Sequence, residues 1–344
     1  MATKRILIFN VNWLGDVLFS TATIRNIRYN FPDAIIACVI PPRCYPVLKD
    51  NPHLDEIIIF DESGKHFGLW GKIAFIRQLK TGKFGLAFLL HRSFTRALIC
   101  YLAGIPVRIG YCTGKQWLVL TKKIIPPDRD RVHRIDYYLN IIQKAGLKAE
   151  DRYTEFFITD EDDKFIQDFL SKKEIQQGDF IVGVNPGGNW LPKRWPKELW
   201  VSLIDRLTRE CGAKVILTGG PEDLVLSRDI GSKLSDKSIT ACGLLSLKQL
   251  GALFKRLDVF ITADSGPIHI ANAVGCKNII GLFGPTNPLI TGPYPGDNVI
   301  ILKKEIGCRI PCYKVNCPDN RCMKAITVDD VVEQVKNSKV YRYR

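Results

Sequence analysis

Short apolar runs alternate with longer amphipathic segments along most of the chain. In the first half, apolar runs typical of buried strands occur at residues 4–11, 35–40, 56–60, 84–90 and 107–110. Between them, residues 17–27, 69–80 and 94–103 carry apolar side chains at helical spacing. Strands that alternate with helices in this way predict a parallel sheet with helices on both faces.

The same alternation starts again at residue 180. The predicted strands of this half cover 180–185, 213–218, 258–262 and 278–283, and the predicted helices cover 196–209, 221–234, 246–257 and 267–274. Between the halves the pattern loosens over 114–151, and the charged segment 160–171 is expected to be a helix that bridges two domains. In sheets of this kind ligands bind beyond the carboxyl ends of the strands, so we expect the site in a cleft between the domains.

The predicted fold class is therefore α/β, with two Rossmann-like domains. The first domain covers 1–170 and the second covers 178–326. A C-terminal helix or tail follows at 327–344. A length of 344 residues agrees with this division, because one ordinary core does not extend over so long a chain.

Composition narrows the class of protein further. Hydrophobic residues make up 46% of the chain and charged residues 24%, as in soluble globular proteins. No apolar run is long enough to predict a membrane-spanning helix, and the N-terminal run is too short for a signal peptide, so a cytoplasmic protein is expected. The net charge of +14 favours an anionic partner, which is a nucleic acid, an acidic membrane or a phosphorylated substrate.

The loop after the first predicted strand, residues 12–16 (NWLGD), is the first candidate site. Gly15 permits a tight turn, and Asp16 lies near the positive end of a helix, where a carboxylate is stabilised. Asp16 is either a helix cap or a general base that takes a proton from an acceptor hydroxyl. The G-x-G-x-x-G fingerprint of dinucleotide-binding domains is absent here, which weighs against a dehydrogenase.

The second candidate site is the junction at residues 185–196 (NPGGNWLPKRWP). Gly187 and Gly188 let the backbone approach a ligand closely. Lys193 and Arg194 place two positive charges beside them. The alternative is an ordinary basic loop before a helix, but the density of glycines and charges favours an anion site.

A third junction, residues 262–269 (TADSGPIH), has the same character. A strand, a small polar turn and a helix with Pro267 near its start aim backbone N–H groups at a phosphate. The positive helix end then opposes the charge on a diphosphate leaving group. His269 either faces this phosphate or packs as a buried side chain, and Glu222, after another strand, either caps a helix or accepts hydrogen bonds from a ribose.

Four of the 11 cysteines form a separate candidate near the C-terminus: Cys308, Cys312, Cys317 and Cys322. Their spacing fits the ligand pairs of zinc sites only loosely, so structural zinc, disulfides and free thiols all stay open. No metal is predicted at the functional site. The other cysteines are scattered and are expected to be small buried residues of a reduced compartment.

Together the three junctions resemble glycosyltransferase family 9, the lipopolysaccharide heptosyltransferases, and are most similar to its type II members. The resemblance extends from Ile6 to Met323. Its most specific parts are G-D-V at 15–17, P-K-R-W-P at 192–196, A-D-S-G-P-I-H at 263–269 and G-P-T at 284–286. The resemblance implies the GT-B architecture, in which two Rossmann-like domains with parallel sheets face each other across a cleft.

The resemblance also implies an activity. It is the transfer of L-glycero-D-manno-heptose from ADP-heptose to the inner core of lipopolysaccharide, on a heptosyl-Kdo₂-lipid A acceptor. The anomeric carbon is inverted, and neither a metal nor another cofactor takes part in catalysis.

Individual residues receive roles from the same resemblance. Asp16, beside Gly15, matches the general base, and Lys193 matches the lysine that meets the diphosphate. Glu222 matches the acidic residue near the ribose, and Leu245 lies where the adenine is held. The other matches to substrate-binding positions are Gly188, Asn189, Arg194, Asp264, Ser265, Gly266 and His269. Ser265 stands where many members have Thr, and Gly188-Asn189 where some have paired Thr.

Basic residues of the first domain are assigned to the acceptor. The predicted acceptor surface comprises Arg108, Lys115, Lys122, Lys123, Arg129, Arg131 and Arg134. Residues 65–83 mix basic and aromatic side chains, as in an interfacial helix or in a helix packed on its own sheet with a solvated basic face. The predicted partners are ADP-heptose, an anionic lipid A-core acceptor and the inner face of the inner membrane, without nucleic acid.

Two other classes of protein are weighed against this prediction. One is another GT-B enzyme, either a different nucleotide-sugar transferase or a nucleotide-sugar epimerase. The other is a non-enzymatic basic protein that binds nucleic acid or a membrane, for which salt would weaken binding steeply. The sequence has no recognisable nucleic-acid module, so this second alternative ranks far behind.

Overall fold

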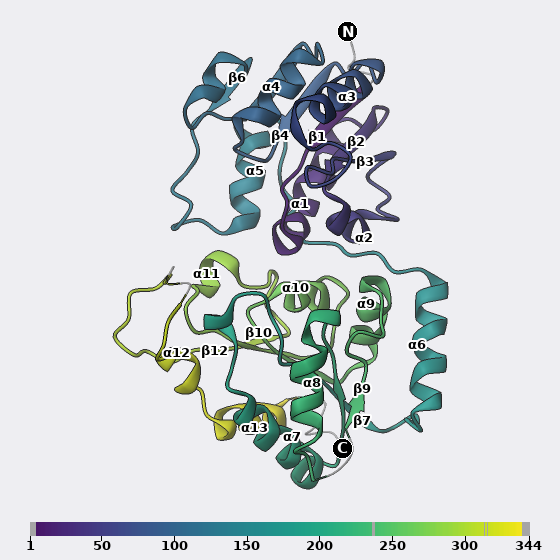
Figure 1. Cartoon of the computed structure of the whole chain (residues 1–344), viewed down its shortest axis with the longest axis vertical. Helices are drawn as coiled ribbons and strands as arrows, with labels where there is room; N and C mark the ends of the chain where they lie inside the picture. The colour runs from purple at the N-terminus through teal and green to yellow at the C-terminus, as the bar shows by residue number, and fades with distance from the viewer. Residues whose placement is uncertain (1–4, 236–237, 313, 315, 339–344) are drawn as a thin grey trace. The chain divides into compact units, whose positions relative to one another are not determined.

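The computed structural model describes residues 5–235, 238–312, 314 and 316–338. The chain separates into two compact units, Met1–Phe157 (unit 1) and Ile158–Arg344 (unit 2) (Figure 1). Helix α6 (Asp160–Lys172), which the sequence analysis places at the end of the first domain, groups with unit 2 and packs against α9 (Leu247–Arg256) there.

Unit 1 is built on a parallel sheet of six strands. The strands are β1 (Arg5–Phe9), β2 (Ile35–Ile40), β3 (Glu56–Ile59), β4 (Leu86–Leu89), β5 (Val107–Tyr111) and β6 (Lys122–Ile124). The helices are α1 (Leu14–Asn30), α2 (Tyr45–Leu48), α3 (Gly68–Thr81), α4 (Phe94–Leu102) and α5 (Arg134–Lys144), with short 3₁₀ turns η1 (Pro42–Cys44) and η2 (Lys115–Leu118). The strand order β3-β2-β1-β4-β5-β6 is the Rossmann order.

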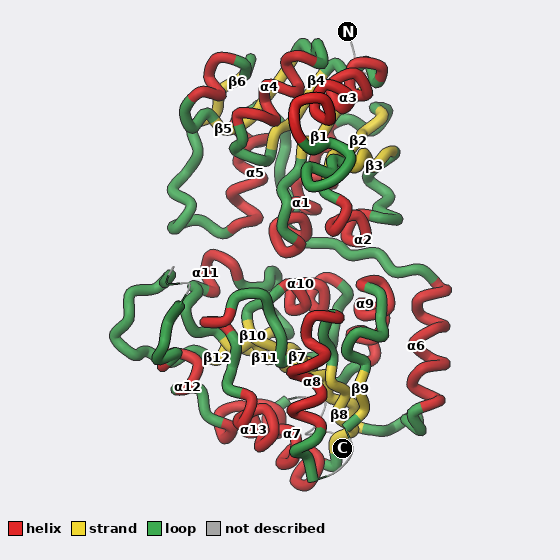
Figure 2. Tube along the Cα trace, in the orientation of Figure 1, coloured by secondary structure: helices red, strands yellow, loops and turns green. Residues whose placement is uncertain are grey.

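Helices flank the strands on both faces, which explains the apolar character of the central strands (Figure 2). In β1, Ile6 and Ile8 point to one face, whereas Leu7 and Phe9 point to the other, and all are buried. The face of Leu7 and Phe9 packs under α3 and α4. Strand β6 and helix α5 lie in the region 114–151 where the sequence pattern loosens, and β6 escaped prediction because it is short and exposes two lysines.

Unit 2 repeats this architecture. Its strands are β7 (Phe180–Asn185), β8 (Ala213–Leu217), β9 (Ile239–Thr240), β10 (Val259–Ala263), β11 (Ile279–Leu282) and β12 (Val299–Leu302). Its other helices are α7 (Lys197–Cys211), α8 (Leu224–Gly231), α10 (Gly266–Ala273), α11 (Pro288–Thr291), α12 (Arg321–Lys324) and α13 (Val328–Asn337), with 3₁₀ turns η3 (Leu191–Lys193) and η4 (Pro221–Asp223). The order β12-β11-β10-β7-β8-β9 is again the Rossmann order, counted from the other edge.

The predicted C-terminal tail, 327–344, contains an integral helix. Helix α13 begins with a capping box between Thr327 and Asp330, and it buries Val331 and Val335 against the sheet and α7. The last residues, 339–344, lie outside the described part of the chain. Among the described residues, no helix combines the length and the apolar character needed to cross a bilayer.

Candidate active site

In each sheet, the first three strands are added towards one edge and the next three towards the other edge. There is therefore one point in each sheet where the connections change direction. In unit 1 this point lies between β1 and β4, and in unit 2 it lies between β7 and β10. The loops at the carboxyl ends of these two strands diverge there and leave a crevice, which is where open α/β sheets bind ligands. All three junctions that the sequence analysis selects follow one of these central strands.

In unit 1 the loop after β1 leads directly into α1. The N-cap of α1 is Trp13, and Asp16 lies in the first turn of the helix, so Asp16 is not the cap residue. Its Oδ1 instead accepts a 2.8 Å hydrogen bond from Tyr138 Oη on α5.

Asp16 opens into a cavity of about 280 Å³. The polar residues that line it are Asn12, Asp16, His91, Arg92, Ser93, Arg129, Tyr137 and Tyr138. They come from the ends of β1 and β4, from α5 and from the segment before α5. The cavity therefore combines one carboxylate with two guanidinium groups, which suits a ligand that carries both hydroxyl and acidic groups.

Two groups of this cavity have shifted protonation equilibria. Burial, followed by the nearby Asp16 carboxylate, raises the pKa of Tyr138 well above its usual value, so Tyr138 stays a hydrogen-bond donor. Burial and the positive charges of Arg96, Arg92 and Arg129 lower the pKa of His91 to about 4. The neutral imidazole accepts a 3.0 Å hydrogen bond at Nδ1 from the backbone N–H of Ser93.

The sequence analysis overlooked His91, Arg92 and Tyr138. The first two directly follow β4, so the rule that ligands bind at strand ends was sufficient to find them. Tyr138 gives no local signal, because its partner Asp16 is 122 positions away in the chain.

The predicted acceptor surface divides into two groups. Arg129 lines the Asp16 cavity. Arg108, Lys122 and Arg134 donate hydrogen bonds to the backbone carbonyls of Val119, Ala145 and Arg129, at 2.5, 2.8 and 2.6 Å, so they hold the fold together.

In unit 2 the central contact joins two of the predicted motifs. Lys193 Nζ, at the end of η3, donates a 2.7 Å hydrogen bond to Oδ2 of the buried Asp264, which directly follows β10. The Lys193 side chain is partly exposed, whereas the Asp264 side chain is almost fully buried. The pair therefore places a half-exposed cation at the switch point of this sheet.

The loop after β7 is shaped by its two glycines. A Cβ atom on Gly187 would lie 2.2 Å from the carboxylate of Asp223, so only glycine fits there without movement of Asp223. Gly188 has a φ of +150°, which disfavours other residues. Arg194 Nε donates a 2.7 Å hydrogen bond to Gly188 O, and an Arg194 guanidinium nitrogen lies 3.8 Å from Asp223 Oδ1.

The loop after β10 ends at the start of α10. Ser265 is the N-cap residue, and its side chain makes no capping hydrogen bond; its Oγ lies 3.3 Å from Thr262 Oγ1. The backbone N–H of Gly266 can therefore face a ligand, whereas Pro267 has no N–H and the N–H of Ile268 donates to Ser265 O at 3.2 Å. His269 is buried one turn into the helix.

The remaining predicted residues lie around this centre. Glu222 is exposed in η4, after β8, whereas the adjacent Asp223 is the buried residue that contacts the glycine loop. Leu245 is half-buried just before α9, whose N-cap Ser246 forms a capping box with Gln249. Asn189 is exposed at the tip of the loop after β7. All of them belong to loops at the carboxyl edge of the second sheet.

The four C-terminal cysteines line one cavity of about 350 Å³. Burial raises the pKa of Cys322, and the neighbouring Cys317 and Cys308 raise it further. No group of three or more candidate metal ligands is assembled within the described part of the chain. The segment instead supports the site, because Asn320 Nδ2 donates a 2.9 Å hydrogen bond to Arg194 O, and the N–H of Cys312 donates to Pro285 O at 2.7 Å.

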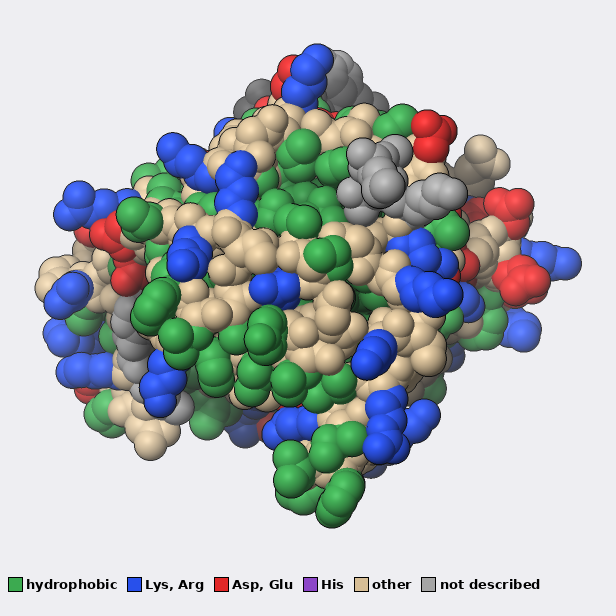
Figure 3. Space-filling view, turned by 90° about the horizontal axis from the view of Figure 1, so that it is seen from above, with side chains coloured by type: hydrophobic (Ala, Val, Ile, Leu, Met, Phe, Trp, Pro, Cys, Tyr) green, Lys and Arg blue, Asp and Glu red, His purple; other side chains and the backbone are tan. Residues whose placement is uncertain are grey.

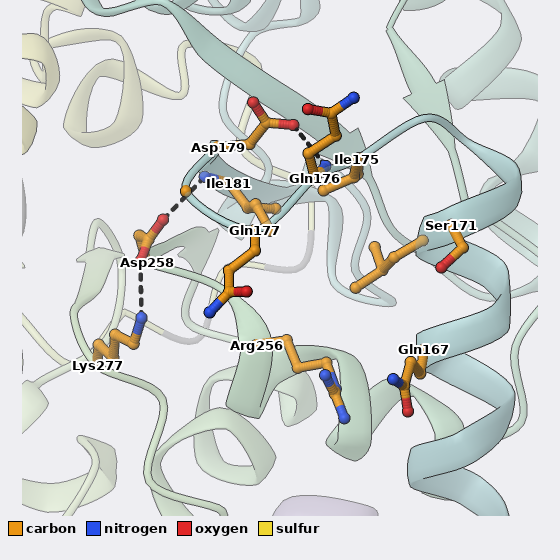
Figure 4. A pocket seen from close by; sticks show the side chains of 12 residues that line it. Gln167, Ser171, Ile175, Gln176, Gln177, Asp179, Ile181, Arg256, Asp258 and Lys277 are labelled. Carbon is orange, nitrogen blue, oxygen red and sulfur yellow. Dashed lines mark hydrogen bonds and ion pairs between the residues drawn. The ribbon is translucent and has the colours of Figure 1, made fainter.

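A larger cavity of about 510 Å³ lies at the opposite, amino edge of the second sheet (Figure 4). Its charged groups already have partners. Asp258 accepts a 3.0 Å hydrogen bond from the N–H of Ile181 and pairs with Lys277 at 2.8 Å, and Arg256 pairs with Asp163 of α6 at 2.6 Å. These contacts anchor α6 and the segment that follows it, so we assign this cavity a structural role.

Two parallel sheets in the Rossmann order, each with polar and basic loops at its switch point, define the GT-B class of glycosyltransferases, as the sequence predicted. Within that class the chain belongs to glycosyltransferase family 9, the heptosyltransferase family, whose sequence profile matches residues 72–321. The resemblance seen in the sequence is thus confirmed, and the chain is a glycosyltransferase enzyme.

Similar proteins include lipopolysaccharide heptosyltransferase 2 of Escherichia coli K12. It is 26% identical over 301 residues, which cover 84% of this chain and 85% of that protein. A solved glycosyltransferase of family 9 from Veillonella parvula superposes with a TM-score of 0.89 at 26% identity, covering 98% of this chain and 97% of that one. The E. coli ADP-heptose lipopolysaccharide heptosyltransferase II has the same fold, with a TM-score of 0.81 at 21% identity and coverage of 99% and 100%.

Proposed function

We propose that this enzyme transfers L-glycero-D-manno-heptose from ADP-heptose to the heptosyl-Kdo₂-lipid A inner core of lipopolysaccharide. The transfer inverts the anomeric carbon, and Asp16 is the general base. The observation that carries this proposal is the cavity in unit 1 that combines Asp16 with Arg92 and Arg129. The similar E. coli protein is named for the second heptose transfer, which supports the choice of acceptor.

In the acceptor half of the reaction, Asp16 takes the proton of the attacking hydroxyl. Tyr138 donates to Oδ1 of Asp16, which fixes the carboxylate and leaves Oδ2 to face the acceptor. Arg92 and Arg129 bind acidic groups of the acceptor, where Kdo supplies carboxylates and lipid A supplies phosphates. Neutral His91 offers a ring nitrogen without adding a further positive charge.

In the donor half, Lys193 neutralises the charge that develops on the departing diphosphate. The pair with Asp264 holds the ammonium group in place before the donor binds, which reduces reorganisation during the reaction. The N–H of Gly266 at the start of α10, beside Ser265, contacts the same phosphates. Glu222 binds the ribose and Leu245 contacts the adenine, and Gly188, Asn189, Arg194 and His269 complete the donor pocket.

The acceptor defines where the enzyme works. Lipid A is anchored in a bilayer, so the enzyme acts from the cytoplasm on the inner face of the inner membrane and makes peripheral contact with it. The net charge of +14 agrees with an anionic surface as a partner.

Replacement of the base tests the proposal directly. The variant Asp16→Asn keeps the hydrogen bond to Tyr138 possible but cannot accept a proton, so we expect acceptor-dependent ADP release to fall by about 10²–10⁴-fold. The variant Asp33→Asn, at an exposed acidic residue just after α1, is the matched control and is expected to keep wild-type activity.

The acceptor identity is tested in the same assay. Wild-type enzyme is given ADP-heptose with either Kdo₂-lipid A or its heptosylated form, and faster ADP release with the heptosylated form is expected. Absence of release with both acceptors, from a folded protein, would refute heptosyl transfer to this core. Wild-type turnover by Asp16→Asn would refute the assignment of the base alone.

A further inference from the structure

The positive charge of the chain is concentrated in one stretch of sequence. Residues 63–127 contain eleven Lys or Arg residues and no Asp or Glu, in a chain whose total net charge is +14. This stretch forms α3, β4, α4, β5, η2 and β6, which make up one half of unit 1. Arg96 pairs with Glu62 just before the stretch at 2.7 Å, and the excess of basic residues that is left attracts anionic surfaces.

Two groups of exposed apolar side chains project from the same half. The first prong consists of Phe67, Leu69 and Trp70 at the start of α3, which are 74%, 70% and 79% exposed. The second prong consists of Trp117 and Leu118 in η2, which are 56% and 61% exposed. Single exposed apolar residues are common on proteins, but such large side chains, adjacent in sequence and nearly fully exposed, indicate a binding surface.

The two prongs lie on the same side of unit 1. Helices α3 and α4 are in contact, and α4 is in contact with η2, so the prongs flank α4 on one face of the sheet. Beneath them Phe75, Ala97 and Val119 belong to one buried core. The first prong follows β3, whereas the residues directly after the second prong lie at the amino end of β5, where Arg108 Nε donates a 2.5 Å hydrogen bond to Val119 O.

Basic side chains accompany each prong. Lys65 and Lys72 flank the first, and Lys115 precedes the second. Lys123 Nζ lies 5.1 Å from the centre of the Trp117 ring, a cation–π contact on the surface. Figure 3 shows one face of the chain, on which hydrophobic side chains lie between Lys and Arg side chains, and the Asp and Glu side chains in view lie towards its edges.

The other face of unit 1 is different. Helices α1 and α5 pack together there, and two arginines of α1 pair with acids. Arg25 contacts Asp151 at 2.5 Å and Glu155 at 2.8 Å, and Arg28 contacts Asp55 at 2.5 Å. This difference in charge pairing between the two faces of unit 1 favours the face that carries the two prongs as the one that meets an anionic surface.

We propose that unit 1 docks on an anionic phospholipid bilayer through the two prongs. The Trp, Phe and Leu side chains insert at the boundary between headgroups and acyl chains, and the adjacent lysines bind lipid phosphates. The aliphatic Leu69 and Leu118 favour a lipid over a nucleic acid, because they offer no ring on which bases stack. The proposal rests on the proposed function in one respect, since a lipid-linked acceptor requires the enzyme to work at a bilayer.

The test uses the full-length enzyme and vesicles of phosphatidylcholine with or without phosphatidylglycerol. Wild-type protein is expected to co-sediment with the anionic vesicles and to release from them as salt is raised. The double variant Trp70→Ser/Trp117→Ser is expected to bind at least about tenfold more weakly, because it loses the side chains that insert. The double variant Tyr29→Ser/Val225→Ser removes two exposed apolar side chains elsewhere and is expected to bind like the wild type.

Two results would overturn the proposal. One is equal vesicle binding by the wild type and the prong variant, or no binding by the wild type. The other is binding to a single-stranded RNA that exceeds vesicle binding and falls in the prong variant, which would identify a nucleic-acid surface.

A water-soluble, deacylated acceptor separates docking from catalysis: the prong variant is expected to use it at the wild-type rate. If the wild-type enzyme does not use this deacylated acceptor, the proposed function is contradicted. The result of the vesicle-binding experiment is not affected by that outcome.

Discussion

At the scale of single residues, the acceptor cavity depends on groups whose charge is fixed by their surroundings. Tyr138 is buried and stays protonated, so it orients Asp16 without competing for the proton. His91 is held neutral by burial and by three arginines. Both of these side chains are therefore uncharged near neutral pH.

His91 makes the stability of unit 1 depend on pH. Its pKa in the folded protein is about 4, below the ordinary value of 6.5. Between these two pH values the unfolded chain binds a proton that the folded chain does not, so the free energy of unfolding decreases as the pH falls through this window. We expect His91→Gln to abolish this part of the pH dependence, so that the free energy of unfolding falls more steeply from pH 7 to pH 4 in the wild type than in the variant.

Urea unfolding at several pH values measures this effect. The midpoints of the wild type and of His91→Gln are compared at each pH. A difference between the two proteins that stays constant from pH 7 to pH 4 would show that His91 titrates alike in the folded and unfolded chains.

At the scale of elements, the conformation of the loop after β7 depends on the close approach of its backbone to η4. Gly187 lies against Asp223, and Asp223 Oδ2 also accepts a 3.2 Å hydrogen bond from the N–H of Gly220. Arg194 joins the same loop through Gly188 O. The position of Lys193, which lies beside Arg194, therefore depends on packing between two loops as well as on its own pair with Asp264.

The variant Gly187→Ala tests this packing. The added methyl group would displace Asp223, which costs about 1–3 kcal/mol as overpacking and shifts the loop that carries Lys193. We expect a raised KM for ADP-heptose and a lowered melting temperature. Gly231→Ala is the matched control, because its nearest neighbour beyond the adjoining backbone is Ser238 Oγ at 4.0 Å. Unchanged kinetics and stability in Gly187→Ala would contradict the role assigned to this loop.

Sequence reasoning succeeded where a signal is local. The apolar strands and the motifs at 192–196 and 263–269 stand out because strand, turn and helix follow one another within a few residues. It did not find Tyr138, whose contact with Asp16 spans the unit, and it favoured Glu222 over Asp223 as the important acid of η4. The burial of Asp223 against Gly187 depends on two loops that come together only in the fold.

At the scale of the whole molecule, the chain consists of two units that each contain a complete sheet and core. The boundary lies before α6, because this helix buries Ile166 and Leu170 and pairs through Asp163 with Arg256 of α9. A capping box between Thr159 and Asp162 starts the helix. The segment 158–172 is therefore expected to be part of the donor-binding domain.

Two fragments test this boundary. The fragment 158–344 is expected to unfold cooperatively and to gain stability from ADP, because a ligand that binds only the folded state shifts the equilibrium. The fragment 173–344 lacks α6 and is expected to melt at a lower temperature or to aggregate. Thermal unfolding of the two fragments is measured with and without ADP. Equal melting temperatures of the two fragments would place the domain boundary at the end of α6 instead.

The shared strand order has a consequence for how the chain is made. The strand at the centre of each sheet, β1 or β7, is also the first strand of its unit to leave the ribosome. One edge of β1 pairs with β2, but its other edge has no partner until residues 86–89 have emerged. During that interval a strand that is apolar from Ile6 to Phe9 exposes an open edge, which is a hazard for aggregation. Production of this enzyme should thus depend on the pace of translation and on chaperones that shield the nascent chain, and it should do so twice in each molecule.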